Sequence, residues 1–488
     1  MVHSDLSKSR VREKGSWHRI LKNHVLYWCL GVAGAFAQVI LARPIYSWEE
    51  RLMATVPLVI MLVSIYRYFN QPYRSVPVIQ IITIQIYIFY SMPQFSQEFM
   101  PFLWGIYSPS QDILVASTIL VVLGEAICLL GYEVASKWIL KGKNLIDRLY
   151  PRPKSNWGLV IMPYALVAFG IYTLCSLRPD YIPVSIRYLL FRIFNVHLSQ
   201  ILLLYLGIIF GKSKYLIMGY IVTVSMSFVG LVQGMVGSIV LPFLILFLSF
   251  WIWGKTIRVR WMVFVILVII VINPVKSIFR QMTWDDKDVS SIGAVERRLT
   301  GWGSAFENTW FGTESKMENI LRTAERLNDL FSFALVVDLV PRAIPFNNGE
   351  DLELAAIYWI PRLIWPEKIG SSDLLYNKYA TIFGYTTIEG TERTTIGASV
   401  FSEAYWNFGI GGVLFFLLLS GLILGINFGN NGRNSEVSII ICLVYFAGVV
   451  QLLSALTVTI PSLITFYVGT LVAMKGIGFV TQVLRKMV

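Results

Sequence analysis

The sequence predicts an all-α, polytopic membrane protein with about 12 transmembrane helices. Of its 488 residues, 56% are apolar and only 14% are charged. A soluble domain is typically about 45–50% apolar and about 25% charged, so this composition excludes a soluble globular protein. It also excludes a disordered chain, which needs low hydrophobicity. One transmembrane helix needs roughly 20 apolar residues, and runs of about that length recur along the chain.

The apolar runs form two groups that are separated by one long polar segment. The runs at 52–66 and 261–275 are short. The region 215–253 contains several glycines, so it could form either two spans or a re-entrant pair. The runs lie near residues 24–42, 52–66, 76–96, 113–133, 158–175, 190–211, 215–231, 235–253, 261–275, 409–427, 437–456 and 463–481.

The distribution of basic residues predicts the orientation. With the N-terminus inside, the cytoplasmic loops and termini carry 22 basic residues, whereas the short external loops carry five. Because basic residues concentrate on the cytoplasmic side, we expect both termini in the cytoplasm. The net charge of +12 then reflects topology and substrate charge, and we expect no nucleic-acid partner.

This orientation divides the chain into four regions. They are a basic cytoplasmic N-terminus at 1–23, transmembrane helices 1–9 at 24–275, a large external loop at 276–408, and transmembrane helices 10–12 with a short cytoplasmic C-terminus at 409–488.

Several kinds of site are excluded by residue type and spacing. The four cysteines show no C-x-x-C spacing, and three of the four histidines crowd the N-terminus, so we expect neither disulfide nor zinc nor a histidine triad. The chain contains no P-loop and no dinucleotide fingerprint. The D-D-K-D run at 285–288 has the oxygens to hold a divalent cation, but a solvated charge run is the favoured interpretation. We therefore expect no metal and no cofactor.

The external loop is where the chemistry is expected. It holds 13 basic residues and 18 of the 29 acidic ones. A structureless loop of this length is uncommon in a compact protein, so we expect it to fold over the external mouth. Its pattern predicts helices at 313–340, ended by Pro341, and at 352–360 and 371–382.

The external arginines are candidates to bind a phosphorylated ligand. Guanidinium is always charged and can bind phosphate through two parallel hydrogen bonds, so an arginine cluster suits a pyrophosphate carried by a lipid. The alternative is that these arginines pair with nearby carboxylates or extend among lipid headgroups. The candidates are Arg280, Arg322, Arg326, Arg342, Arg362 and Arg393.

One external carboxylate is a candidate general base. Glu403 lies in the sequence SEAYWNFGIGG at 402–412, just before the span that begins at 409. A carboxylate there is expected to face the external mouth, where it could take a proton from a substrate hydroxyl.

Four segments of the chain resemble a known family. The segment WIPRLIWPEK at 359–368, the triplet Asn377-Lys378-Tyr379, the pair Thr394-Thr395 and SEAYWNFGIGG at 402–412 resemble the oligosaccharide repeat-unit polymerases of the Wzy type, which make O-antigen, capsule and exopolysaccharide. These resemble one another in an I-P-R-x-x-W-P-x-K turn and in an E-x-Y-x-N-F-G-x-x-G start of a late span. The match covers roughly residues 315–412.

The resemblance implies a glycosyltransferase of a bacterial inner (plasma) membrane with a GT-C-like helical fold. Such an enzyme moves a growing glycan from undecaprenyl pyrophosphate to a second lipid-linked repeat unit, so donor, acceptor and membrane lipids are the implied partners, together with a chain-length-regulating co-polymerase. Arg362 and Lys368 match the turn, and Glu403 and Asn407 match the start of the late span. The related O-antigen ligases use a histidine in the large external loop, which residues 276–408 lack.

Two other classes compete with this interpretation. A lipid-linked oligosaccharide flippase or polysaccharide transporter would also have many spans with both ends inside. Transporters often contain inverted repeats. Here the large external loop separates nine predicted spans from three, and the sequence shows no internal repeat. An accessory subunit of a polysaccharide export complex is the third class.

Overall fold

The computed structural model describes 15 stretches of the chain. They are residues 24–41, 47–70, 76–95, 109–139, 149–177, 181–253, 259–283, 292–312, 328–353, 360, 364–365, 377–388, 397–428, 436–449 and 456–487.

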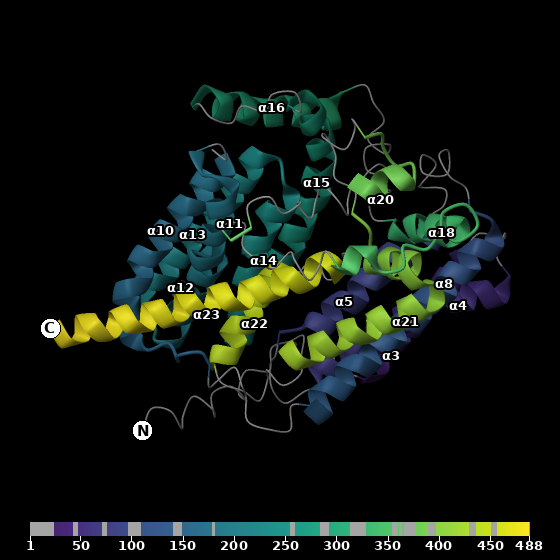
Figure 1. Ribbon diagram of the computed structural model, residues 1–488, viewed down its shortest axis with the longest axis horizontal. Helices are drawn as coiled ribbons and strands as arrows, with labels where there is room; N and C mark the ends of the chain where they lie inside the picture. Colours follow the sequence, from purple (N-terminus) through teal and green to yellow (C-terminus); the bar gives the residue numbers. More distant parts are fainter. Residues whose placement is uncertain are drawn as a thin grey trace.

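The elements in these stretches are helices (Figure 1). In chain order they are α3 (His24–Leu41), α4 (Trp48–Phe69), α5 (Val78–Ile86), η1 (Tyr87–Ser91), α6 (Met92–Phe95), α8 (Gln111–Val134), η3 (Ala135–Ile139), η4 (Ser155–Trp157), α10 (Gly158–Leu177), α11 (Val184–Ile193), α12 (Val196–Ile209), α13 (Ser213–Gln233), α14 (Val236–Ile252), α15 (Val259–Thr283), α16 (Ile292–Phe311), α18 (Asp329–Leu339), α20 (Asn377–Ile382), α21 (Val400–Phe428), α22 (Glu436–Val449) and α23 (Leu456–Met487).

Within the described residues, 7 helical stretches are long and apolar enough to cross a membrane. They are Trp48–Phe69, Gln111–Lys137, Ser155–Leu177, Leu189–Ile209, Ser213–Gln233, Val400–Ile426 and Ser462–Lys486. Two shorter apolar helices, Tyr27–Ile40 and Val236–Ile252, coincide with further predicted runs. The predicted helical fold, with several helices long and apolar enough to cross a membrane, is confirmed for the described residues, whereas the number of about 12 spans stays a prediction.

The three remaining predicted spans differ in detail from their apolar runs. The run at 76–96 is divided into α5, the π-helical turn η1 and α6. The run at 261–275 lies inside the longer helix α15. The run at 437–456 begins as α22, residues 450–455 lie outside the described part, and α23 begins at its last residue.

The helix α12 forms the centre of one half of the bundle. Its residues from Leu198 to Ile208 are buried on all sides, including Gln200, whose amide donates to Thr223 Oγ1 and to the carbonyl of Pro242. A helix that is apolar all round is expected to be enclosed by its neighbours. The helices α10, α13, α14 and α22 pack around it.

The helices α8 and α21 pack backbone against backbone in the other half of the bundle. A Cβ atom added to Gly421 would lie 2.0 Å from the carbonyl oxygen of Cys128, and one added to Gly131 would lie 2.6 Å from that of Leu418. Small residues permit this close approach of membrane helices. The contact fixes α21, which carries the candidate base, to a long apolar helix.

The described helices of the segment 276–408 gather toward one end of the bundle. Figure 1 shows α16 lying across the ends of the neighbouring helices, with α20 and α18 on the other side of the same end. The indole of Trp302 donates to the carbonyl of Leu231 (2.8 Å), and the guanidinium of Arg298 donates to that of Val232 (3.2 Å). These bonds satisfy two carbonyls in the last turn of α13, which attaches α16 to the bundle.

The predicted external helices are found in part. The helix predicted at 313–340 is described from Asp329, where the Asn328 side chain accepts a bond from Phe331 N, and it ends before Pro341 as expected. The residues 313–327 lie outside the described part. The helix predicted at 371–382 is described as α20, and only the first turn of the one predicted at 352–360 is described, at 350–353.

Candidate functional site

A sharp break divides α21 at the start of the predicted tenth span. Phe408 (φ −141°, ψ 20°) and Gly409 (φ 60°, ψ −144°) leave the helical conformation, so residues 400–407 and 410–428 are two helical segments. The second segment begins where the apolar run predicted a span. The first segment packs against α18, with the Phe401 and Phe333 rings 5.7 Å apart.

The break explains two glycines of the sequence SEAYWNFGIGG. The backbone of Gly409 has a combination of angles that is essentially restricted to glycine. A Cβ atom on Gly412 would lie 2.1 Å from the carbonyl oxygen of Ala404, because the break folds the first segment back onto the second. Gly411 has nothing within 4 Å of its Cβ position. The F-G-x-x-G spacing therefore encodes the break.

Asn407 connects this break to the loop that follows α18. Its amide Nδ2 donates to the carbonyl of Glu403 (2.9 Å), while its Oδ1 accepts from the backbone N–H of Gly349 (2.9 Å) and from the amide of Asn347 (3.1 Å). The backbone N–H of Asn347 donates in turn to the carbonyl of Trp406 (3.0 Å). Asn407 has no exposed surface, so these bonds satisfy a fully buried side chain.

Asn347, Asp351, Lys378 and Asn407 form one hydrogen-bonded group, which we call the Asn347 network. The Asn347 amide donates to Asp351 Oδ2 (2.7 Å), and Lys378 Nζ donates to Asn347 Oδ1 (2.6 Å). Lys378 Nζ also lies 3.6 Å from Asp351 Oδ1 and 3.0 Å from Glu350 Oε2. The four residues come from three segments that are far apart in the sequence.

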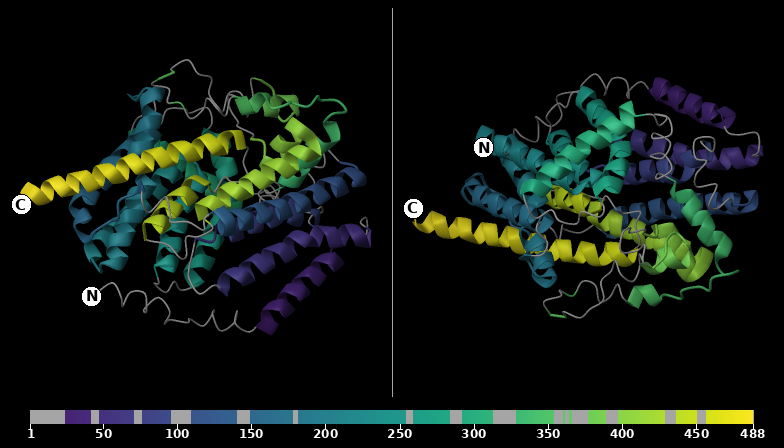
Figure 2. Two further views of the ribbon diagram at one scale, coloured as in Figure 1. Left: turned by 60° about the horizontal axis from the view of Figure 1, so that its bottom comes forward. Right: turned by 90° about the horizontal axis from the view of Figure 1, so that it is seen from above.

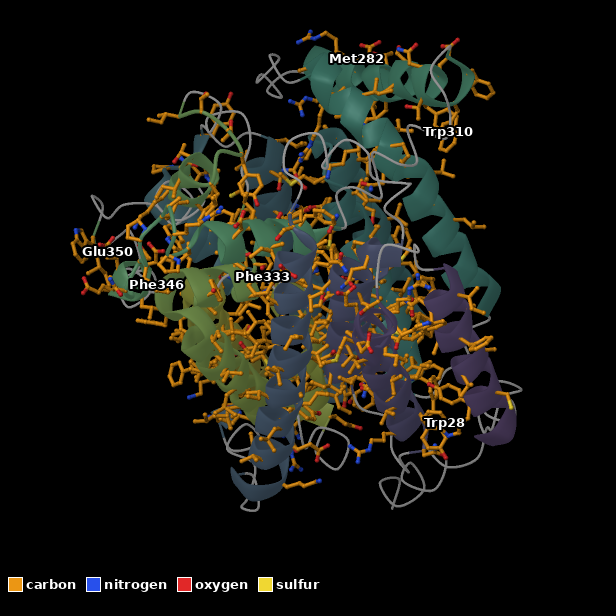
Figure 3. The ribbon with its side chains drawn as sticks, turned by 90° about the vertical axis from the view of Figure 1, so that its right-hand side faces the viewer. Trp28, Met282, Trp310, Phe333, Phe346 and Glu350 are labelled. Carbon is orange, nitrogen blue, oxygen red and sulfur yellow. The ribbon has the colours of Figure 1, made fainter. Side chains whose placement is uncertain are left out.

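The network holds a buried carboxylate opposite a partly exposed cation. The Asp351 side chain is 1% exposed and the Lys378 side chain is 27% exposed. Burial raises the pKa of Asp351, while the charge of Lys378 and its hydrogen bond lower it. Figure 3 shows Phe346 and Glu350 on the outer side of this region and Phe333 farther inside, so the network lies between the surface and the helix bundle.

Aromatic rings hold α20 against the first segment of α21. The Tyr379 ring lies 4.9 Å from that of Phe383 and 6.2 Å from that of Trp406, and Lys378 Nζ lies 5.3 Å above the Trp406 ring. Tyr379, Phe383 and Trp406 are buried in a small core with residues of α18. Figure 2 shows α18, α20 and the start of α21 from two further directions. This packing fixes the ammonium of Lys378 over the network.

The structure describes four of the residues that the sequence predicts for the site. Glu403 and Asn407 lie together, four residues apart on the first segment of α21. Glu403 was expected at an open mouth, but it has no exposed surface, because the break turns its segment back against α18. Arg342 pairs with Asp338 (2.8 Å) on the exposed end of α18, and Arg280 lies in the last turn of α15.

The other predicted residues, Arg322, Arg326, Arg362, Arg393 and Lys368, lie outside the described part of the chain. Among the described residues, no group of His, Cys, Asp or Glu is arranged to hold a metal ion.

Sequence reasoning did not select Asn347 and Asp351. Their spacing of four residues in N-N-G-E-D, after a helix ended by proline, is the only local signal, and it resembles that of an ordinary polar turn. For Lys378, the resemblance of Asn377-Lys378-Tyr379 is the only signal in the sequence.

Comparison with known proteins identifies one family. A family model described as "Domain of unknown function (DUF8712)" matches residues 120–455, which include α8 from Leu120 onward, the whole external segment and α21. No curated protein and no solved structure matches the chain.

Proposed function

The chain belongs to the family of the domain of unknown function DUF8712, and we propose that it is a membrane glycosyltransferase that polymerises lipid-linked oligosaccharide repeat units. The donor is a growing glycan on undecaprenyl pyrophosphate, and the acceptor is a second lipid-linked repeat unit. The fold would be GT-C-like, with about 12 spans in a bacterial inner membrane.

One observation supports this proposal above the others. The two described segments that carry the resemblance, Asn377–Tyr379 and 402–412, contact each other at the end of the bundle where the external helices gather. Lys378 and Tyr379 pack on Trp406, and Asn407 joins the same network as Lys378. Residues that match a motif for a common reaction are expected to meet at one site.

The chemistry of the reaction needs little more than such a site. The sugar–pyrophosphate bond already carries the activation, so no nucleotide is required. The protein must orient an acceptor hydroxyl and stabilise the negative charge that develops on the leaving pyrophosphate. Basic residues near the membrane surface suit the stabilisation of the leaving pyrophosphate, and a buried carboxylate suits the orientation of the acceptor hydroxyl.

The proposal is tested with purified protein in liposomes and an undecaprenyl-pyrophosphate-linked repeat unit. We expect a ladder of lipid-linked oligomers longer than one unit, resolved by gel electrophoresis or mass spectrometry. Movement of a fluorescent lipid-linked glycan across the bilayer without elongation would instead identify a flippase.

The predicted orientation has its own test. Cysteines introduced at Ser7 and Ser290 are expected to react differently with a membrane-impermeant thiol reagent in intact, right-side-out membranes, because 276–408 is external and the N-terminus is cytoplasmic. Only the cysteine at Ser290 should be labelled before the membrane is permeabilised. Labelling confined to Ser7 would reverse the orientation.

Arg362 is proposed to bind the donor pyrophosphate. It lies between Pro361 and Pro366 in the sequence, which restrict the backbone, and a guanidinium forms two parallel bonds to phosphate. We expect Arg362→Ala to lower turnover by about 100-fold, the effect of removing one preorganised stabilising donor. Arg362→Lys should recover part of the activity. A stably folded Arg362→Ala protein with near-normal polymerisation would remove this residue from the site.

A further inference from the structure

Three tyrosines form a second polar cluster beside the Asn347 network. Tyr90 of η1 and Tyr379 of α20 are each 1% exposed, and Tyr385 lies just after α20. In the part of the chain that the structure describes, none of their hydroxyl oxygens makes a well-formed hydrogen bond, although each has another hydroxyl close by. Buried hydroxyls are normally well paired, so three in one place without a well-formed bond indicate a site for a polar ligand.

Asp329 is the charged residue of this cluster. It opens α18, which packs against η1, α8 and α21. Its charge acts on all three tyrosines, and the rings of Tyr379 and Tyr385 lie 5.7 Å apart. The described residues contain no ion pair for Asp329.

Part of the cluster reaches the surface. Asp329, Ser332, Ser399 and Tyr385 are each partly exposed, whereas Tyr90 and Tyr379 lie beneath them. Serine hydroxyls lie beside the tyrosines, namely Ser399 next to Tyr90, Ser402 next to Tyr379 and Ser332 next to Tyr385. A ligand that enters here meets hydroxyl groups that both donate and accept, together with one carboxyl group.

The ionisation of Asp329 suits proton transfer near neutral pH. Burial raises the pKa of Asp329 to about 6. Burial is also the main reason why the pKa values of Tyr379 and Tyr385 are raised, and the Asp329 charge adds to it, so both phenols stay protonated. A general base works best when its pKa lies close to the working pH.

The motif segments connect this cluster to the Asn347 network. Tyr379 follows Lys378, and Ser402 lies five residues before Asn407 on the same helical segment, so each segment contributes residues to both groups. A negative carboxylate disfavours an anionic ligand, and no metal-binding group is present among the described residues. Neutral, hydroxyl-rich carbohydrate is the ligand that this combination fits.

We infer that Asp329 is the general base for the acceptor sugar and that Tyr90, Tyr379 and Tyr385 bind the neighbouring sugar hydroxyls. This inference rests on the proposed function. The acceptor O–H bond breaks and its proton passes to the Asp329 carboxylate. The freed oxygen forms a bond to the anomeric carbon of the donor, whose bond to the phosphate oxygen breaks with the electron pair leaving on the pyrophosphate.

The test compares Asp329→Asn with Asp338→Asn, a matched change at the other end of α18. We expect Asp329→Asn to lower kcat by about 100-fold or more with little change in acceptor KM, and Asp338→Asn to remain near normal. The asparagine should fold at least as well at neutral pH, because an ionised carboxylate with a raised pKa destabilises the native state. Asp329→Glu should restore part of the rate.

The pH profile gives a readout that a structural role would not change. Wild-type turnover is expected to rise as the pH increases through about 6, and Asp329→Asn should lose that rise. The elements packed on α18 bring other ionisable groups, namely Tyr90 from η1, Asp112 from α8, and Glu403 and Tyr405 from α21. Comparison with the asparagine variant isolates the contribution of Asp329.

Polymer formation by Asp329→Asn at the wild-type rate and with the wild-type pH profile would overturn the inference and leave the proposed function intact. Absence of any polymer from the wild-type protein would instead count against the proposed function. In that case the cluster is tested by measuring the melting temperature with the free repeat-unit oligosaccharide. If the oligosaccharide stabilises the wild type, and stabilises the Tyr379→Phe/Tyr385→Phe variant less, carbohydrate binding at the cluster is supported. If it does not stabilise the wild type, the cluster does not bind this carbohydrate.

Discussion

Replacing Lys378 by methionine is expected to destabilise the protein by about 3 kcal/mol, at the lower end of the range for breaking a buried ion pair. Asp351 is 1% exposed and lies 3.6 Å from the ammonium, so the substitution leaves a buried carboxylate without its cation. The estimate is taken at the low end because Lys378 is 27% exposed and solvent screens part of its charge. Asn347 also loses the donor to its Oδ1.

The loss of stability should depend on pH. Burial already raises the pKa of Asp351 in the wild-type protein, and the charge of Lys378 lowers it. Without the lysine the pKa is expected to rise further. A carboxyl group with a raised pKa costs nothing while it is protonated in both states, and it destabilises the native state as the pH rises through its folded pKa. The melting temperature of Lys378→Met should therefore fall further below wild type at about pH 8 than at about pH 5.

The matched control for this prediction is the double variant Lys378→Met/Asp351→Asn. An asparagine oxygen can still accept from the Asn347 amide but carries no charge. The double variant should melt closer to wild type than Lys378→Met alone, measured by tryptophan fluorescence of the purified protein in detergent. Additive losses in the double variant, or an unchanged melting temperature in the single one, would show that Lys378 and Asp351 do not interact as the structure indicates.

Composition and charge predicted the class of fold because membrane helices obey a simple physical requirement. A segment that crosses a bilayer must be apolar over its whole length, so its residues reveal it without knowledge of its neighbours. The start of the predicted span at 409 coincides with the break at Gly409. Here the apolar run begins at the same residue whose backbone conformation only glycine readily adopts. The end of α18 before Pro341 follows from the same kind of local rule.

The candidate site could be predicted only in part because its contacts join distant residues. Glu403 and Asn407 belong to one recognisable segment. Asn347 comes from a separate loop, 60 residues before its partner Asn407 on α21 and 31 residues before its partner Lys378 on α20. Nothing in a local pattern distinguishes an amide that will be buried from one in solvent. The burial of Glu403 likewise depends on how the break folds the chain back, which helical periodicity does not reveal.

The helix α16 was missed for a related reason. Its buried residues are Ala294, Trp302, Ala305 and Thr309, and Arg298 beside them is partly buried. Most of these are small or polar, so the apolar pattern is weak although the spacing is helical. The partners that stabilise it are carbonyl groups at the end of α13. A hydrogen bond to a distant helix end leaves no signal in the residues around it.

Gly412→Ala is expected to prevent the correct fold around the site, whereas Gly411→Ala should be tolerated. A Cβ atom at position 412 would lie 2.1 Å from the carbonyl oxygen of Ala404, a distance that no native contact between these atoms reaches. The clash is with backbone, so no side-chain rotation relieves it. The segment 400–407 would have to move away from the rest of α21, which would separate Asn407 from Gly349 and Asn347.

The two glycines form a matched pair that isolates this effect. Both lie in the same helical segment after the break, and alanine improves the intrinsic helix propensity at either position by about 1 kcal/mol. Gly411 has open space at its Cβ position, so Gly411→Ala should keep the wild-type yield, elution profile and polymerisation. Gly412→Ala should accumulate poorly, aggregate on gel filtration or melt well below wild type. Equal behaviour of the two variants would show that α21 does not fold back at Phe408 and Gly409, and would separate Asn407 from the network on which the proposed site depends.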